Sequence, residues 1–204
     1  SAEGFVEYIA RNVLNHTEAF DNAAWTKDGV TVDDDFVTSP YGADTADKLT
    51  YTGEGDSIYQ TITRAVAANQ VWIASVWLRA AAPCTVTLVS YNDDSSDGTG
   101  VTCNLTTTWQ RFTVAHTFAG IETGVRLSIQ TNTGDTALVV YAWGAQLEQG
   151  SATNTLPTTY QPKPRVNYAD MFAAIEAGTA YTALMSSKET GKTAHTGTAY
   201  LSNL

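Results

Sequence analysis

The sequence has few basic residues, few cysteines and no long apolar run. Its 11 lysine and arginine residues stand against 21 aspartate and glutamate residues, which gives a formal net charge of −10. So acidic a chain is repelled by phosphate backbones and by anionic lipid surfaces. No window approaches the roughly 18 apolar residues that a membrane-spanning helix requires, and the first residues lack the pattern of a signal peptide. We therefore expect a soluble protein that binds neither nucleic acids nor membranes directly.

Cysteine is too rare for a disulfide scaffold. The two cysteines, Cys84 and Cys103, show no CxxC spacing. They lie on the two strands of a predicted hairpin in which Tyr91 pairs with Thr99, and that register places the thiols on opposite faces of the sheet. We expect both thiols to be free and partly buried. A disulfide is the alternative if a β-bulge shifts the register.

Sequence motifs of common enzymes are also missing. The chain has no GxSxG, HExxH or DxDxDG pattern. His16, His116 and His195 are far apart and have no carboxylate or nucleophile at a meaningful spacing. Residues 186–193 resemble the end of a phosphate-binding loop, but Ser186 stands where that motif needs glycine, and the residues that follow do not predict a helix. We expect no enzymatic activity.

Threonine, serine, glycine, asparagine and aromatic residues are abundant, which is typical of an all-β protein with many turns. About eight or nine short alternating segments are separated by turn signals and not by helices. Residues 70–80, QVWIASVWLRA, carry large apolar side chains at both parities, which predicts a central strand covered on both faces. The predicted fold is an all-β antiparallel sandwich, a jelly roll, over residues 1–152.

The segment 141–150, YAWGAQLEQG, is predicted to be the closing strand of this sandwich. We expect Trp143 to fill the core and Gly144 to let a neighbouring backbone or ring approach closely. Gln146 and Glu148 are expected to anchor the N-terminal segment that begins near Arg11.

The character of the sequence changes after residue 152. Residues 153–166 hold three closely spaced prolines and are predicted to form an extended connector. Residues 167–204 are predicted to form an arm made of a short helix and a hairpin. Met171, Phe172 and Ile175 make an apolar stripe on that helix. So short a helix cannot stand alone in water, and we expect the stripe to contact a partner subunit.

Two kinds of ligand are compatible with the residues present. Aromatic rings stack on the apolar faces of sugars, and Tyr59, Trp72 and Tyr91 are the candidates for glycan binding. The alternative for each ring is packing in the core or at an interface.

Carboxylates offer the second kind of site. Asp33 and Asp35, and Asp93 and Asp94, supply oxygen ligands of the kind that a structural calcium ion takes. Neither stretch has the spacing of a defined calcium loop, and solvated loops are the alternative. We expect no other cofactor.

Several segments, in a characteristic order, resemble one family. These are RNVLNHTEAFDNAAWTKDGVTV (11–32), SPYGADTADKLT (39–50), VWIASVWLRA, TTTWQRFTVAHTF and YAWGAQLEQGSATNTLPTTYQP (141–162). They resemble the carbohydrate-binding-module-like jelly-roll domains in virion proteins of tailed bacteriophages. The resemblance implies a jelly roll, a location in the phage particle and no catalysis.

The resemblance leads to two functional hypotheses. The first is a structural virion protein made in the host cytoplasm, either a head decoration (cement) protein or a small tail or fibre component. It would contact capsid or tail subunits and form a homo-oligomer, for which we expect a trimer. The alternative is a carbohydrate-binding module that binds glycans of the host surface.

Overall fold

The computed structural model describes residues 12–151 and 156–160. These residues form strands and turns, and none of them lies in a helix that could span a membrane. The strands are β1 (Thr26–Asp28), β2 (Val30–Thr38), β3 (Asp44–Tyr51), β4 (Ser57–Val66), β5 (Val71–Ala80), β6 (Cys84–Asn92), β7 (Gly98–Leu105), β8 (Gln110–Thr117), β9 (Glu122–Gln130) and β10 (Leu138–Gln149).

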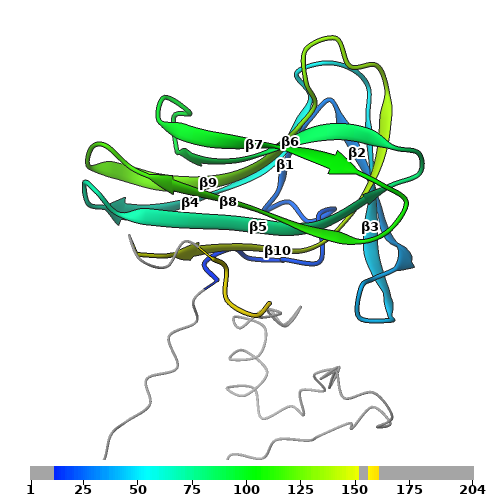
Figure 1. The fold of residues 1–204 in the computed structure, drawn as a ribbon, viewed down its shortest axis with the longest axis horizontal. Coiled ribbons are helices and arrows are strands. Elements are labelled where there is room, and N and C mark those ends of the chain that lie inside the picture. The colour runs from blue at the N-terminus through cyan, green and yellow to red at the C-terminus, as the bar shows by residue number, and fades with distance from the viewer. Residues whose placement is uncertain (1–11, 152–155, 161–204) are drawn as a thin grey trace, which may run out of the picture. The chain divides into compact units, whose positions relative to one another are not determined.

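The strands form two five-stranded sheets (Figure 1). Sheet A has the order β1-β4-β9-β6-β7, and sheet B has the order β2-β3-β10-β5-β8. Neighbouring strands are antiparallel in both sheets. Six of the eight neighbouring pairs join strands that are not consecutive in sequence, as in a jelly roll. The predicted all-β antiparallel sandwich is confirmed.

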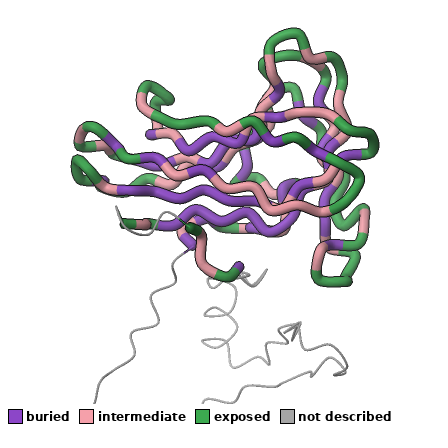
Figure 2. Tube along the Cα trace, in the orientation of Figure 1, coloured by how far each residue is buried: buried purple, intermediate pink, exposed green. Residues whose placement is uncertain are grey.

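The core lies between the inner faces of the two sheets. Buried residues follow the strands, and exposed residues gather in the turns (Figure 2). Strand β5 is buried on both faces, as its apolar residues at both parities predict: Trp72 and Val76 face the core, while Ile73, on the other face, is only 2% exposed. The outer face of sheet B must therefore be covered by other parts of the chain.

The hairpin of β6 and β7 has a different register from the predicted one. Tyr91 pairs with Gly98 and not with Thr99, so that Cys84 pairs with Leu105 and Val86 with Cys103. A shift of one residue reverses the face of every side chain on one strand. Both thiols consequently lie against the core, on the same face, and both are free. The prediction that they lie on opposite faces was wrong.

Strand β10 changes the direction of its side chains at a bulge. Gly144 has φ +64° inside an irregularity between Trp143 and Gln146. The residue that follows, Ala145, faces the core, but Trp143 lies on the outer face of sheet B in a second cluster with Ala46 and Tyr160. Trp143 is thus fully buried, although outside the main core where we expected it.

The N-terminal segment is held by the backbone of β10. Val13 donates its N–H to the carbonyl oxygen of Leu147 (2.8 Å), and Ala145 donates to Thr17 (2.9 Å). The side-chain amide of Asn12 bonds the carbonyl of Ala145 at 3.0 Å. These contacts run along the half of β10 that no longer pairs with β3, so the N-terminal segment takes the place of a strand there.

Residues 156–160, here called the strap, pack on the outer face of sheet B. Thr158 donates its N–H to Glu148 Oε1 (2.6 Å), and the ring of Tyr160 lies 4.6 Å from that of Trp143. Gln146 Nε2 donates to Thr158 Oγ1 at 2.8 Å. Gln146 and Glu148 therefore bind the strap, which comes from the predicted connector, and not the N-terminal segment as expected.

The chain consists of two compact units, residues 1–162 and 163–204, within each of which the residues contact mainly one another. The strap belongs to the first unit, so the sandwich uses residues beyond the predicted boundary at 152. The rest of the predicted connector lies outside the described residues. So does the predicted arm, with Met171, Phe172 and Ile175.

Candidate binding site on sheet A

The outer face of sheet A carries two of the three predicted glycan-binding residues. Its strands alternate: Ile58, Leu88 and Leu127 face the core, so their neighbours in sequence point outward. Strand pairing then aligns Thr61, Arg126, Tyr91 and Gly98 in one row across β4, β9, β6 and β7. Tyr59 lies in the adjacent row, on β4, and is half-buried like Tyr91 and Arg126.

Arg126 stacks on Tyr59. Its guanidinium carbon lies 4.4 Å from the centre of the tyrosine ring, which is a cation–π contact. Arg126 Nε donates to Thr61 Oγ1 (2.9 Å), and Nη1 donates to Ser95 Oγ (2.6 Å). Nη2 donates to the backbone carbonyl of Asp93. The guanidinium is thus fixed from three sides, and Tyr59 with it.

Tyr91 lies over a glycine of the neighbouring strand. A Cβ atom at Gly98 would come within 2.2 Å of Tyr91 Cδ1 and 2.9 Å of Cε1. The ring therefore occupies the space that a side chain at position 98 would need. Two positions further along the strand, a Cβ at Gly100 would meet Thr87 Cγ2 at 2.9 Å. The absence of a side chain at Gly98 lets the Tyr91 ring lie close to the neighbouring strand.

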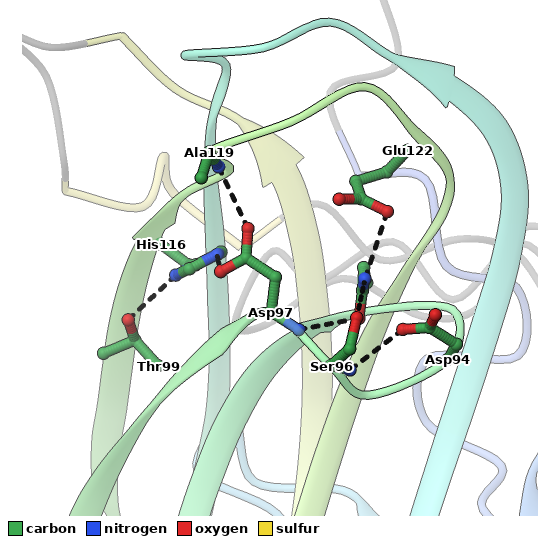
Figure 3. Close-up of polar contacts among 8 residues, drawn as sticks. Asp94, Ser96, Asp97, Thr99, His116, Ala119 and Glu122 are labelled. Atoms are coloured by element: carbon green, nitrogen blue, oxygen red, sulfur yellow. Dashed lines mark hydrogen bonds and ion pairs between the residues drawn. The ribbon is translucent and has the colours of Figure 1, made fainter.

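The β6–β7 loop, residues 92–97, lies beside this surface and is ordered by polar contacts (Figure 3). Asp97 donates its N–H to Asn92 Oδ1 (3.2 Å), and Asn92 Nδ2 donates to Glu122 Oε2 (3.0 Å). Ser96 donates its N–H to Asp94 Oδ1 at 2.9 Å, and hydrogen bonds from the hydroxyl and the N–H of Ser96 lower the pKa of Asp94. The loop that supplies two acceptors to Arg126 therefore has its own internal support.

Trp72, the third predicted glycan ligand, is not at this surface. It lies on the inner face of β5, has no exposed area and packs in the main core. The guanidinium of Arg64 lies 4.8 Å from its ring centre. A sugar cannot reach a ring that is fully enclosed, so the assignment of Trp72 to a glycan site was wrong.

The four predicted calcium ligands have other contacts. Asp33 forms an ion pair with Lys48 (2.7 Å), and Asp35 has φ +48° and donates its N–H to Asp47. Asp93 Oδ2 accepts from Thr123 Oγ1 at 2.6 Å, while Asp94 accepts from the loop itself. Within residues 12–151 and 156–160, no three carboxylate, histidine or cysteine side chains converge as a metal site would require.

Arg126 is the site residue that the sequence analysis missed. A signal for it exists: Arg126 stands between Val125 and Leu127 in a strand, which places it on the face opposite to the core. Arg126 stacks on Tyr59 because β4 and β9 are neighbours in the sheet, which places the two residues diagonally opposite each other, and because the β6–β7 loop holds the guanidinium. These elements are distant in sequence, so no single segment predicts the contact.

The outer face of sheet B has a different character because the strap covers part of it. Under the strap, Arg111 Nη2 donates to Ser75 Oγ (2.9 Å) and Gln146 Oε1 (3.2 Å), and burial lowers the pKa of this guanidinium. Arg111 Nη1 donates to the carbonyl of Thr158 at 3.0 Å. This part of the sheet is closed by the protein's own residues.

A further set of side chains on sheet B, here called the aromatic–cation row, comprises Phe36, Lys48, Tyr141, Arg79 and Trp109. Lys48 Nζ lies 4.5 Å from the ring centre of Phe36, whose ring stacks on Tyr141 at 6.3 Å and 16°. The Arg79 guanidinium lies 4.5 Å from the Tyr141 ring and 5.3 Å from the Trp109 ring. Neighbouring side chains thus already occupy the ring faces, although Phe36 remains 51% exposed.

The chain is similar in fold to several solved structures. One is the enzymatically active domain of tailspike protein 4 of bacteriophage CBA120, with a TM-score of 0.50 and 15% identity over 69% of this chain. The match spans only 21% of the tailspike chain. Likeness at this identity shows the fold alone.

Two carbohydrate-binding modules are also similar to the chain. A CBM4 structure has a TM-score of 0.49 and 13% identity, covering 62% of this chain and 95% of that one. The CBM22-1 xylan-binding domain of Paenibacillus barcinonensis Xyn10C has a TM-score of 0.49 and 15% identity, covering 63% of this chain and 87% of that one. No protein-family model and no curated protein matches the sequence.

Proposed function

We propose that this protein is a non-catalytic module that binds a neutral glycan on the outer face of sheet A. The observation that carries the proposal is the stack of Arg126 on Tyr59 (4.4 Å) beside Tyr91, on a face left free by the strap. Half-buried rings held in place by their neighbours bind sugars with little loss of side-chain entropy. The resemblance of the sequence to carbohydrate-binding-module-like jelly rolls supports the same class of ligand.

The chemistry around the rings fits a sugar. Pyranose rings present C–H groups to aromatic faces and hydroxyls to their surroundings. On this face the row of Arg126 and Tyr91 begins at the half-buried Thr61, so a hydroxyl group flanks the rings. With a net charge of −10 the protein repels polyanions, which favours neutral over acidic polysaccharides.

A glycan array followed by calorimetry tests the proposal. We expect binding to a neutral glycan, and an affinity loss of about tenfold or more for Tyr59→Ala and for Tyr91→Ala, because each substitution removes a stacking ring. Phe36→Ala is the matched control, since it removes an exposed ring from sheet B. Silence across a broad array, or equal affinity in all three variants, would exclude this function.

A structural role in a phage particle is the second candidate, and the aromatic–cation row favours it. Tyrosine, tryptophan and arginine are the residues that dominate protein interfaces. Tyr141 has two stacking partners, Phe36 and Arg79, whereas Tyr59 has one, Arg126. The row therefore presents ring edges and charged groups, which suit a protein surface better than a sugar. We propose that the row contacts a second copy of this chain within a virion.

Two measurements separate this candidate from the first. If the row is a contact surface, Arg79→Glu lowers the sedimentation coefficient of the protein and its incorporation into particles, while glycan affinity stays unchanged. Copy number per particle then distinguishes head decoration, with hundreds of copies, from a tail or fibre component with far fewer. A monomeric wild-type protein that is missing from purified particles would refute the structural role.

A further inference from the structure

The binding surface on sheet A is linked to a histidine that belongs to sheet B. His116 lies on β8, and its side chain is buried against the β6–β7 side of the sandwich. Its Nε2 atom lies 3.0 Å from Asp97 Oδ1, and its Nδ1 atom lies 2.9 Å from Thr99 Oγ1 (Figure 3). Asp97 Oδ2 accepts the N–H of Ala119 at 2.9 Å. Asp97 thus accepts a hydrogen bond through Oδ2 from the turn after β8, and its Oδ1 lies beside the His116 ring without the geometry of a hydrogen bond.

Asp97 in turn closes the β6–β7 loop. Asn92 donates its N–H to the carbonyl of Asp97 (2.9 Å), and Asp97 donates its own N–H to the Asn92 side chain (3.2 Å). Between these two residues the chain turns through Ser95, which has φ +66° and donates its N–H to the Asn92 carbonyl at 3.4 Å. A loop of six residues closed in this way transmits a shift of Asp97 to Ser95, because it contains no free segment to absorb the shift.

Ser95 and Asp93 of the same loop supply two of the three acceptors that hold Arg126. If the loop moves, Arg126 keeps only its bond to Thr61 (2.9 Å), and the guanidinium is free to leave the ring of Tyr59. His116 and Tyr59 are thus joined by a continuous series of contacts from one sheet to the other.

We infer that His116 and Asp97 shape the binding surface by fixing the loop that positions Arg126 over Tyr59. They are positioning residues and do not touch the sugar. The inference rests on the proposed glycan function, but its structural part, the coupling of Asp97 to Arg126, can be measured without any sugar. Substituting either residue is expected to loosen Arg126 and to weaken glycan binding.

The first experiment follows the Nε–H signal of Arg126 by NMR in Asp97→Asn and His116→Gln. We expect solvent exchange of this proton to accelerate by about tenfold or more in both variants, because local contacts govern local opening. Asp97→Asn keeps the size of the side chain. It therefore still tests the inference if His116→Gln does not fold. Asp135→Asn, in the turn after β9, is the matched control and should leave the signal unchanged. An unchanged Arg126 signal in a folded Asp97→Asn variant overturns the inference, whether or not the protein binds glycans.

The second experiment is a double-mutant cycle on glycan affinity. Asp97→Asn should lower the affinity of the wild-type protein but have no effect in an Arg126→Ala background, because both substitutions remove the same arrangement. An equal effect in both backgrounds overturns the inference. If the Arg126 signal responds while the wild-type protein binds no glycan, the coupling stands and the proposed glycan function falls.

Discussion

The ring of Tyr160 lies directly over Gly144, where a Cβ atom would come within 3.2 Å of two ring carbons. The contact joins the strap to the bulge in β10, the strand that also holds the N-terminal segment. The positive φ and the Tyr160 ring both restrict which side chain position 144 can carry. A substitution there therefore tests how the strap is attached.

Replacing Gly144 by alanine is expected to destabilise the protein by roughly 2 to 4 kcal/mol, because the backbone strain of an L-residue at φ +64° adds to the collision with Tyr160. Urea unfolding measures the change. Gly134→Ala is the matched control, since Gly134 also has a positive φ (+85°) but nothing within 4 Å of the added methyl group. Equal losses for the two variants would mean that the ring contact contributes nothing.

The buried carboxyl group of Asp47 makes stability depend on pH. Burial raises its pKa to about 6, although backbone N–H groups of Phe20 and Asp35 bond it at 2.6 and 2.9 Å. Folding therefore favours the protonated form of Asp47. Its contribution to the free energy of unfolding is fully present below the unfolded pKa of 3.8 and is lost as the pH rises through about 6. The free energy of unfolding should fall by up to about 3 kcal/mol between about pH 4 and about pH 7.

Urea unfolding at several pH values checks this effect, with Asp47→Asn as the variant that cannot titrate. Asp56 and Asp94 have lowered pKa values, so their contribution is lost only below the unfolded value of 3.8, outside this window. The same slope in the wild-type protein and in Asp47→Asn would show that Asp47 is not the cause.

The two thiols should differ in reactivity. Burial raises the pKa of Cys103 to about 11, so at about pH 8 only about one thiol in a thousand is ionised. Burial also raises the pKa of Cys84, but this residue is partly exposed. Pulsed alkylation followed by mass spectrometry should modify Cys84 first and Cys103 only on unfolding. Equal rates in the native protein would contradict the burial of Cys103.

Gly98→Ala is expected to displace Tyr91 and to cost about 1 to 3 kcal/mol, because the new methyl group would also meet the backbone oxygen of Ser90 at 2.7 Å. Ring resonances of Tyr91 should shift, and glycan affinity should fall with them. Gly120→Ala serves as control, because its methyl group would meet only a Glu122 oxygen at 3.6 Å. An undisturbed Tyr91 in Gly98→Ala would show that the ring does not rely on the glycine.

The sequence predicts the sandwich and its central strand because alternation and turn residues are local signals. The double-sided apolar pattern of β5 also predicts that both of its faces are covered. The same pattern cannot say which of Trp72 and Trp77 faces the core, since both parities are equally apolar, and this ambiguity made Trp72 look like a candidate for a surface site. A close approach at Gly144 was predicted correctly, but the partner of Gln146 and Glu148 was not.

Long-range placement accounts for the other differences. The register of β6 and β7 depends on how residues 92–97 close, and that loop is held by contacts with Glu122 of β9, His116 of β8 and Ala119 of the turn after β8. Arg126 gains its role only when β4, β9 and this loop meet. Such contacts join distant segments, and no window of the sequence contains both partners.

The hydroxyls of Thr17 and Tyr160 form a hydrogen bond of 2.8 Å across 143 positions of the chain. A ribosome makes the first of these residues long before the second, and the strap, which bonds Glu148 and Arg111, is made after all ten strands. During synthesis Trp143 and the outer side of β10 therefore stay uncovered until residue 160 has left the exit tunnel. We expect nascent chains that end before the strap to bind chaperones and those that end beyond it to be released.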